Sequence, residues 1–134
     1  MDDFEYATEI EVRYRDLDAM GHVNNAVYAT FLEQARMDYF RDVVGEDLAD
    51  VGGVIAHLEI DYRRAVTPED DAVVVAVRVP ELGDSSVPME YEIRADGEVA
   101  ATAEVVQVAV DPETGESRSL PGVWRDRIST YEGL

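Results

Sequence analysis

The chain has 134 residues, of which 46% are hydrophobic, and this size and composition predict one folded domain spanning residues 1–134. Asp and Glu number 30 against 11 basic residues, so the formal net charge is −19, and every basic residue is an arginine. Such a charge repels phosphate backbones and anionic lipid surfaces, which argues against nucleic-acid and membrane binding. Cysteine is absent, which excludes disulfides, thiolate catalysis and cysteine-ligated metals.

The acidic residues are spread along the chain rather than gathered in a tail, and their mutual repulsion destabilises a compact domain in dilute buffer. At about 1 M salt the Debye length falls to about 3 Å and the repulsion is largely screened. Acidity without lysine is typical of proteins from salt-accumulating halophiles, and we expect such an origin. Neither a basic leader with an apolar stretch nor a run of about 18 apolar residues occurs, so we expect a soluble cytoplasmic protein.

The first third of the chain changes its periodicity once. Residues 9–14 alternate between apolar and charged side chains and predict a strand, whereas glycine and closely spaced acids over 15–22 predict a loop. Over residues 25–43, apolar side chains recur every three or four positions and predict a long helix. Asn24 is a suitable N-cap and Gly45 stands where a C-terminal cap is expected.

Period two returns after the helix and indicates further strands. These strands are expected over residues 54–62, 73–79, 87–93 and 99–110. In the first of them one apolar face is expected to hold Val54, Ala56, Leu58, Ile60 and Tyr62. Asp96-Gly97 predicts a tight turn between the last two strands, and the tail 121–134 is expected to form a short helix or to cover a sheet edge.

The order of one strand, a long helix and four strands predicts an α+β fold, a five-stranded antiparallel sheet wrapped around one long central helix. A single layer of this kind leaves the edges of the sheet open. Pairing two sheets edge to edge closes one of those edges, so we expect a homodimer at least, with a tetramer left open.

Candidate chemistry is densest over residues 13–28, where two carboxylates and a histidine precede the capped start of the helix. A helix N-terminus presents unpaired N–H groups and partial positive charge, which suit an oxyanion forming on a carbonyl. A carboxylate just before it could attack that carbonyl or activate a water. The alternative is that Asp16, Asp18, Asn24 and Asn25 serve only as turn and capping residues.

The run D-L-D-x-x-G-H-V-N-N-x-x-Y over residues 16–28, followed by F-L-E-Q-A-R over 31–36, resembles the hotdog-fold acyl-CoA thioesterases of the 4-hydroxybenzoyl-CoA thioesterase-like family. Plant acyl carrier protein thioesterases share a similar stretch. The resemblance implies the hotdog fold and hydrolysis of an acyl-CoA by water, without a cofactor.

The resemblance also implies roles for particular residues. The second acid of the motif, Asp18, matches the catalytic carboxylate, which acts as a nucleophile through an anhydride or as a general base. The backbone N–H of Asn25 matches the group that polarises the thioester carbonyl. Asp16 matches the family's first acid and is expected to order the loop. The residues implied to line the pocket are His22, Val23, Asn24 and Tyr28.

The motif also departs from its relatives. The hydroxybenzoyl enzymes carry apolar or aromatic residues where this chain has His22, Asn24 and Asn25, which argues against a hydroxybenzoyl substrate. The cysteine of the plant enzymes has no counterpart. Aliphatic and other aryl acyl groups on coenzyme A therefore remain open.

Weaker candidates lie outside the motif. Arg63 and Arg64 are candidates for the coenzyme A phosphates, because guanidinium forks suit phosphate, although charge balancing explains them as well. Ser85 and Ser86 belong to a turn and could reach the pantetheine arm. Glu33 either orients active-site groups or crosses a dimer interface.

Glu33 could alternatively form an ordinary surface pair with Arg36, three positions further along the helix. His57, Glu59 and Asp61 alternate on one strand face and could in principle offer metal ligands. A solvated acidic face explains them more simply, so no metal site is predicted.

Two other functions use the same residue types. A hotdog hydratase or dehydratase acting on an enoyl thioester would use an aspartate and a histidine together, which Asp18 and His22 supply. A non-catalytic module would bind an acyl thioester in the same pocket. Release of a free thiol separates hydrolysis from both alternatives.

The dependence of stability on salt concentration tests the interpretation that the acidic composition reflects a halophilic origin. Urea unfolding in about 0.05 M and about 2 M KCl should give a higher free energy of unfolding at high salt, because the repulsion is screened there. Thioesterase activity should rise in parallel. Equal stability and full activity in the dilute buffer would contradict the halophile interpretation.

Overall fold

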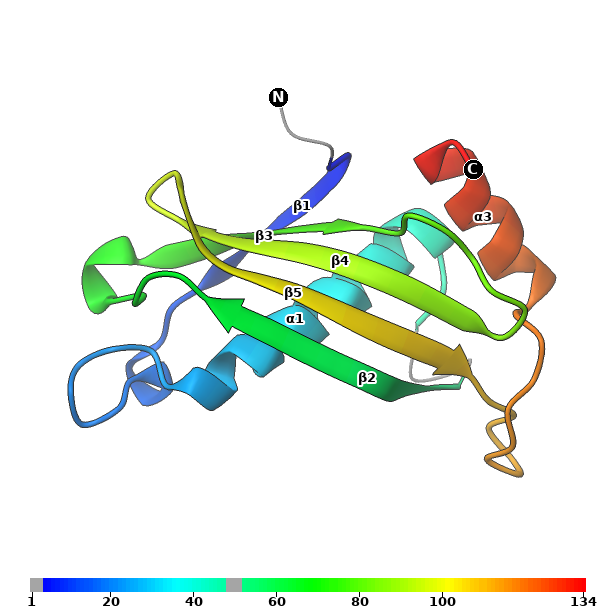
Figure 1. The fold of residues 1–134 in the computed structure, drawn as a ribbon, viewed down its shortest axis with the longest axis horizontal. Coiled ribbons are helices and arrows are strands. Elements are labelled where there is room, and N and C mark those ends of the chain that lie inside the picture. Colours follow the sequence, from blue (N-terminus) through cyan, green and yellow to red (C-terminus); the bar gives the residue numbers. More distant parts are fainter. Residues whose placement is uncertain (1–3, 48–51) are drawn as a thin grey trace.

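The computed structural model describes residues 4–47 and 52–134, and it contains a five-stranded sheet with antiparallel neighbours throughout. Across the sheet the strands are β1 (Tyr6–Glu11), β3 (Ala72–Arg78), β4 (Ser86–Ala95), β5 (Glu98–Ala109) and β2 (Gly53–Tyr62). The long helix α1 (Asn25–Tyr39) lies across one face of the sheet, here called the inner face (Figure 1). The predicted α+β arrangement is confirmed.

The start of α1 is fixed by its cap. The side-chain oxygen of Asn24 accepts a hydrogen bond from the backbone N–H of Ala26 at 2.9 Å, an arrangement that stabilises a helix by about 1 kcal/mol. Leu32, Ala35 and Tyr39 recur on the face turned to the sheet and are fully buried. Burial of a side chain such as Leu32 contributes about 1.5–3 kcal/mol, so packing on the sheet holds the helix in place.

The end of the helix departs from regular geometry. After α1 the chain widens into one π-helical turn, η2 (Phe40–Val44), and stops at Gly45, which adopts φ 84°. Glycine tolerates this left-handed conformation, so the predicted C-terminal cap is confirmed. Thr8 of β1 donates a hydrogen bond to Asp38 of α1 at 2.8 Å and ties the edge strand to the helix.

The first strand is shifted relative to the prediction of 9–14. The structure has β1 at Tyr6–Glu11, and residues Tyr14–Asp16 form a 3-10 turn, η1. The carboxylate of Asp16 accepts the backbone N–H of Arg13 at 2.8 Å, which bends the chain before Tyr14 can continue the strand. Tyr14 consequently points into solvent with 92% of its surface exposed.

The predicted apolar face of β2 is also wrong in part. A bulge between Ile55 and His57 shifts the register, so Val54 lies opposite Val108 on the outer face and Ile55 opposite Gln107 on the inner face. Leu58 remains on the inner face yet is 47% exposed, because β2 is an edge strand.

The tail forms helix α3 (Gly122–Glu132), so the helix expected within 121–134 is confirmed. Trp124 is fully buried with its ring 4.9 Å from that of Phe40. The carboxylate of Glu132 accepts hydrogen bonds from the Tyr39 hydroxyl at 2.7 Å and from the Val79 N–H at 3.0 Å, joining α3 to α1 and to the end of β3. No helix in the described part of the chain is long and apolar enough to cross a membrane.

Candidate active site

The loop before α1 is held by backbone hydrogen bonds. Asp18 donates its N–H to the carbonyl of His22 at 2.8 Å, and Gly21, at φ 77°, closes the turn by donating to the carbonyl of Asp18 at 3.1 Å. Val23 donates to the carbonyl of Val66 at 2.8 Å, which anchors the loop to the segment after β2. The loop is therefore a defined turn rather than a loose connection.

The carboxylate of Asp18 is oriented by this turn. Its Oδ1 accepts hydrogen bonds from the N–H groups of Met20 at 2.8 Å and His22 at 3.2 Å. Within residues 4–47 and 52–134, Oδ2 accepts none. One oxygen thus fixes the position of the carboxylate while the other is available to a water or a substrate.

The first turn of α1 presents an unpaired backbone hydrogen-bond donor at the cavity that Asp18 lines. The Asn24 side chain is used by the N–H of Ala26, and the N–H of Asn25 has no acceptor in the described part of the chain. Unpaired N–H groups at a helix start carry partial positive charge. The Tyr62 hydroxyl donates to the Asn25 carbonyl at 3.0 Å and attaches the helix start to β2.

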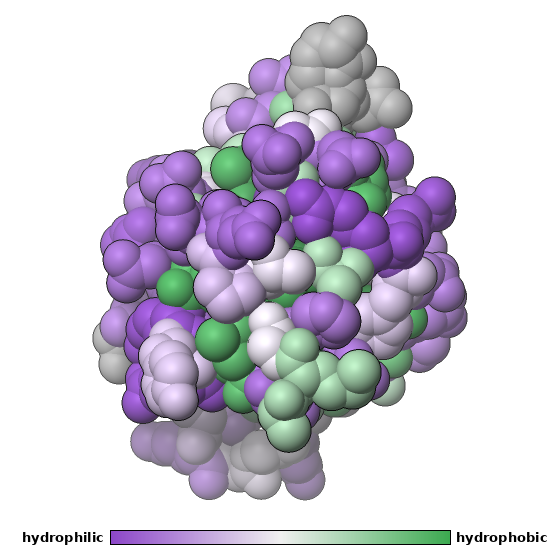
Figure 2. Space-filling model, turned by 90° about the vertical axis from the view of Figure 1, so that its left-hand side faces the viewer, coloured by the Kyte–Doolittle hydropathy of each residue, from purple (hydrophilic) through white to green (hydrophobic). Residues whose placement is uncertain are grey.

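Asp18 and Asn25 line the same cavity, which has a volume of about 290 Å³. The residues around it are Asp18, His22, Val23, Asn25, Tyr28, Tyr62, Arg63, Arg64 and Ala65. The cavity lies at the end of the molecule where α1 begins, and Figure 2 shows this end covered mostly by hydrophilic residues with small hydrophobic areas between them. Most residues implied by the motif are therefore brought together, and both candidate arginines join them.

Tyr62 is a pocket residue that the sequence analysis did not identify as part of the site. Its ring meets that of Tyr28 edge to face with centroids 4.9 Å apart. The Tyr28 hydroxyl accepts the N–H of Val66 at 3.3 Å, and burial raises the pKa of Tyr28, so this hydroxyl stays neutral. The alternation of β2 placed Tyr62 on its inner face, but only the fold shows that this face ends at the helix start.

The two arginines have different surroundings. Arg64 donates to the Asp70 carboxylate at 3.0 Å and to the Ala95 carbonyl at 3.1 Å, and this guanidinium holds the pKa of Asp70 below its usual range. Arg64 is therefore mainly a brace for the loop after β2. The Arg63 side chain is exposed and forms no hydrogen bond or ion pair within the described residues.

The lining of the cavity does not include three other candidates, Asn24, Asp16 and Glu33. Asp16 is 5% exposed, holds the turn at Arg13 and lines a different hollow between β1 and α1. Glu33 is exposed on α1. The alternative of a surface pair between Glu33 and Arg36 is wrong, because Arg36 is only 6% exposed and donates to the Tyr91 hydroxyl at 3.2 Å beneath the helix.

Ser85 and Ser86 lie at the far end of the sheet within one protomer. Ser86 pairs with Val108 of β5, whereas Tyr62 pairs with Ala101, seven residues earlier on the same strand. At about 3.4 Å per residue that separation is about 24 Å. The structure does not bring the two serines to the cavity of Asp18.

The chain matches the model of the Thioesterase-like superfamily over residues 12–128. It is 30% identical over 128 residues to the long-chain acyl-CoA thioesterase FadM of Escherichia coli, covering 90% of this chain and 95% of that protein. Among solved structures, a Thermus thermophilus thioesterase complexed with coenzyme A and Zn is 40% identical with a TM-score of 0.89, covering 100% of this chain and 98% of the other. A DHNA-CoA thioesterase from Staphylococcus aureus is 28% identical with a TM-score of 0.86, covering 96% and 91%.

Proposed function

The chain belongs to the Thioesterase-like superfamily and is a thioester hydrolase with the hotdog fold, and from this premise we propose that it cleaves acyl-CoA at the cavity of Asp18. The observation that carries the proposal is the pairing of two groups in one cavity. They are the Asp18 carboxylate, with one oxygen not engaged by the described residues, and the unpaired N–H of Asn25. An acyl thioester needs both a nucleophile or base and a donor for its carbonyl oxygen.

In the proposed reaction the thioester carbonyl oxygen accepts a hydrogen bond from the Asn25 N–H. Negative charge that develops on this oxygen is stabilised by the donor and by the positive end of the α1 dipole. Asp18 either attacks the carbonyl carbon, forming an anhydride that water then opens, or removes a proton from the attacking water. In both cases the C–S bond breaks, and the products are the free acid and the thiol of coenzyme A.

The walls of the cavity suggest how the two parts of the substrate bind. Val23, Tyr28 and Tyr62 offer apolar and aromatic surface to an acyl group near the thioester. Arg63 stands at the cavity with an exposed guanidinium, the group that best matches phosphate, in a chain whose net charge otherwise repels an anionic coenzyme. A relative that binds coenzyme A in its crystal structure supports this part of the proposal.

The Asp18→Asn variant tests the assignment. We expect kcat for thiol release from an acyl-CoA to fall by about 10²–10⁴, because the amide neither attacks the carbonyl nor accepts a proton from water. The substitution preserves shape, and the amide oxygen can still accept the N–H groups of Met20 and His22, so thermal unfolding should change little.

Asp16→Asn is the matched control, since it removes an equal charge two residues away at a side chain outside the cavity. Its kcat should fall less than that of Asp18→Asn. Full activity of a folded Asp18→Asn enzyme would overturn the assignment. Substrate binding by wild type without thiol release would favour the binding module instead.

We also propose that the active unit is a pair of chains that meet along β2. This strand is an edge of the sheet, and large apolar side chains remain open on it, with Val54 51%, Ile55 42%, Leu58 47% and Tyr62 49% exposed. An unpaired edge with exposed apolar residues is a template for another strand, and a second copy of the same strand fits it by twofold symmetry. The pair would place two cavities near one interface, because Tyr62 lines the cavity.

Sedimentation in about 2 M KCl, where charge repulsion is screened, measures this assembly. Wild type should sediment with the mass of two or four chains. Leu58→Arg should shift the population to single chains, because a charge on this strand opposes burial. Tyr14→Arg, the same change of charge at an exposed aromatic residue outside β2, should leave the mass unchanged. A wild-type protein that sediments as a single chain would contradict the proposal.

A further inference from the structure

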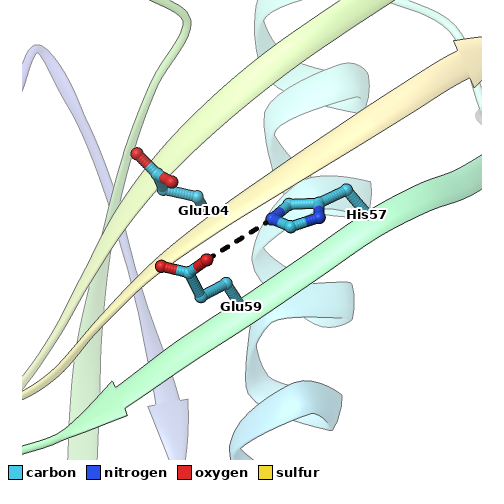
Figure 3. A group of neighbouring side chains, drawn as sticks. All are labelled: His57, Glu59 and Glu104. Atoms are coloured by element: carbon cyan, nitrogen blue, oxygen red, sulfur yellow. Dashed lines mark ion pairs between the residues drawn. The ribbon is translucent and has the colours of Figure 1, made fainter.

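A second group of ligand-bearing side chains lies on the outer face of the sheet, away from α1. His57 and Glu59 project from β2 and Glu104 from the adjacent strand β5, all toward the same side (Figure 3). One potential ligand atom from each side chain lies within 4.8 Å of the others. The Nε2 atom of His57 is 3.7 Å from a carboxylate oxygen of Glu59.

The register of the sheet places like charges against one another at this point. Glu59 pairs directly with Glu104, and Glu104 pairs directly with Glu90 on its other side. Like charges directly opposite one another destabilise a sheet. Glu90 is neutralised by Arg78 at 2.6 Å, whereas Glu104 has no hydrogen bond or ion pair within residues 4–47 and 52–134. Glu59 and Glu104 therefore face each other with His57 as their neighbour and without an arginine between them.

A hollow of about 500 Å³ adjoins the group on the same face. Its lining residues are Phe4, Glu59, Asp61, Arg78, Glu90, Tyr91, Glu92, Thr102, Ala103 and Glu104. The two glutamates are thus accessible from a recess in the sheet surface that has room for an ion with its remaining water ligands.

We propose that His57, Glu59 and Glu104 bind a divalent transition-metal ion of the Zn²⁺ class. The ligand atoms indicate the class of metal. An imidazole nitrogen suits Zn²⁺ and other first-row transition metals, whereas a site with only oxygen ligands would suit Mg²⁺ or Ca²⁺. Three protein ligands with an open position for water are a normal coordination for Zn²⁺. The ion replaces the missing positive charge between Glu59 and Glu104 and links the edge strand β2 to β5 just beyond the bulge at Ile55.

This site is separate from the cavity of Asp18, because the two lie on opposite faces of the sheet and share no residue. Its consequence is structural. An ion bound by the folded chain and not by the unfolded chain raises the stability of the fold. We therefore expect bound metal to stabilise the pairing of β2 with β5, and thermal unfolding rather than thiol release is the measurement that tests the site.

The test titrates chelator-treated full-length protein with ZnCl₂ against a chromophoric zinc indicator in about 2 M KCl, where diffuse attraction of cations is screened. Wild type should bind one ion per chain and unfold at a higher temperature when it is loaded. His57→Gln and Glu104→Gln should each weaken binding by at least about tenfold, because even the loss of a group that only orients a metal ligand typically costs that much affinity. Either variant alone tests the site if the other fails to fold.

Asp61→Asn is the matched control, because it removes one carboxylate from the same face of the same strand outside the group. It should bind Zn²⁺ like wild type. The proposal is overturned by equal weakening in Asp61→Asn, which would indicate a diffuse charge effect, by Ca²⁺ binding as tightly as Zn²⁺, or by no saturable binding in wild type.

Discussion

The packing of α1 against the inner face of the sheet determines where this chain can perform chemistry. Leu32, Ala35 and Tyr39 are fully buried there, so the helix cannot slide or rotate without exposing its core face. Its N-terminus is consequently fixed at one end of the sheet, beside the end of β2, where the Tyr62 hydroxyl holds the carbonyl of Asn25. The helix leaves the opposite face of the sheet uncovered, and the histidine and glutamates proposed to bind metal occupy that face (Figure 1).

Charge affects this protein both through the field of its whole surface and through individual pairs of side chains. Over the whole surface, 30 acidic residues against 11 arginines make a field that opposes both compaction and the approach of an anionic substrate. At particular positions, arginine side chains offset this negative charge. Arg64 braces the loop after β2 through Asp70, and the neighbouring Arg63 remains exposed at the cavity. On the outer face Arg78 neutralises Glu90. Glu59 and Glu104 have no arginine partner within the described residues.

The sequence was sufficient for the parts of the fold that depend on local periodicity and capping. The helix from Asn25 with its Asn24 cap, the stop at Gly45 and the order of strands follow from patterns within a few residues. The errors arose where a side chain or a bulge overrode the pattern. Asp16 bends the chain at residue 14, and the bulge after Ile55 moves Val54 to the outer face.

For the candidate site too, the sequence identified residues that are close together in the chain and missed those that are distant. The motif over 16–28 located the residues on the loop and the first helical turn, which are neighbours in sequence. The roles of Tyr62 and Arg36 depend on contacts between α1 and the sheet. Tyr62 contacts Asn25, 37 residues away in the sequence, and Arg36 contacts Tyr91, 55 residues away. No local pattern carries such pairings, because they exist only once the helix is seated on the sheet.

In the proposed reaction the N–H of Asn25 holds the thioester carbonyl in the cavity that Asp18 also lines. The most direct measurement follows backbone amide resonances of the Asp18→Asn protein as a non-hydrolysable acyl-CoA thioether ketone is titrated. We expect the resonance of the Asn25 amide to shift most strongly, together with those of residues 18–24. Shifts confined to other surfaces, such as the hollow between β1 and α1, with the Asn25 amide unchanged at saturation, would contradict it.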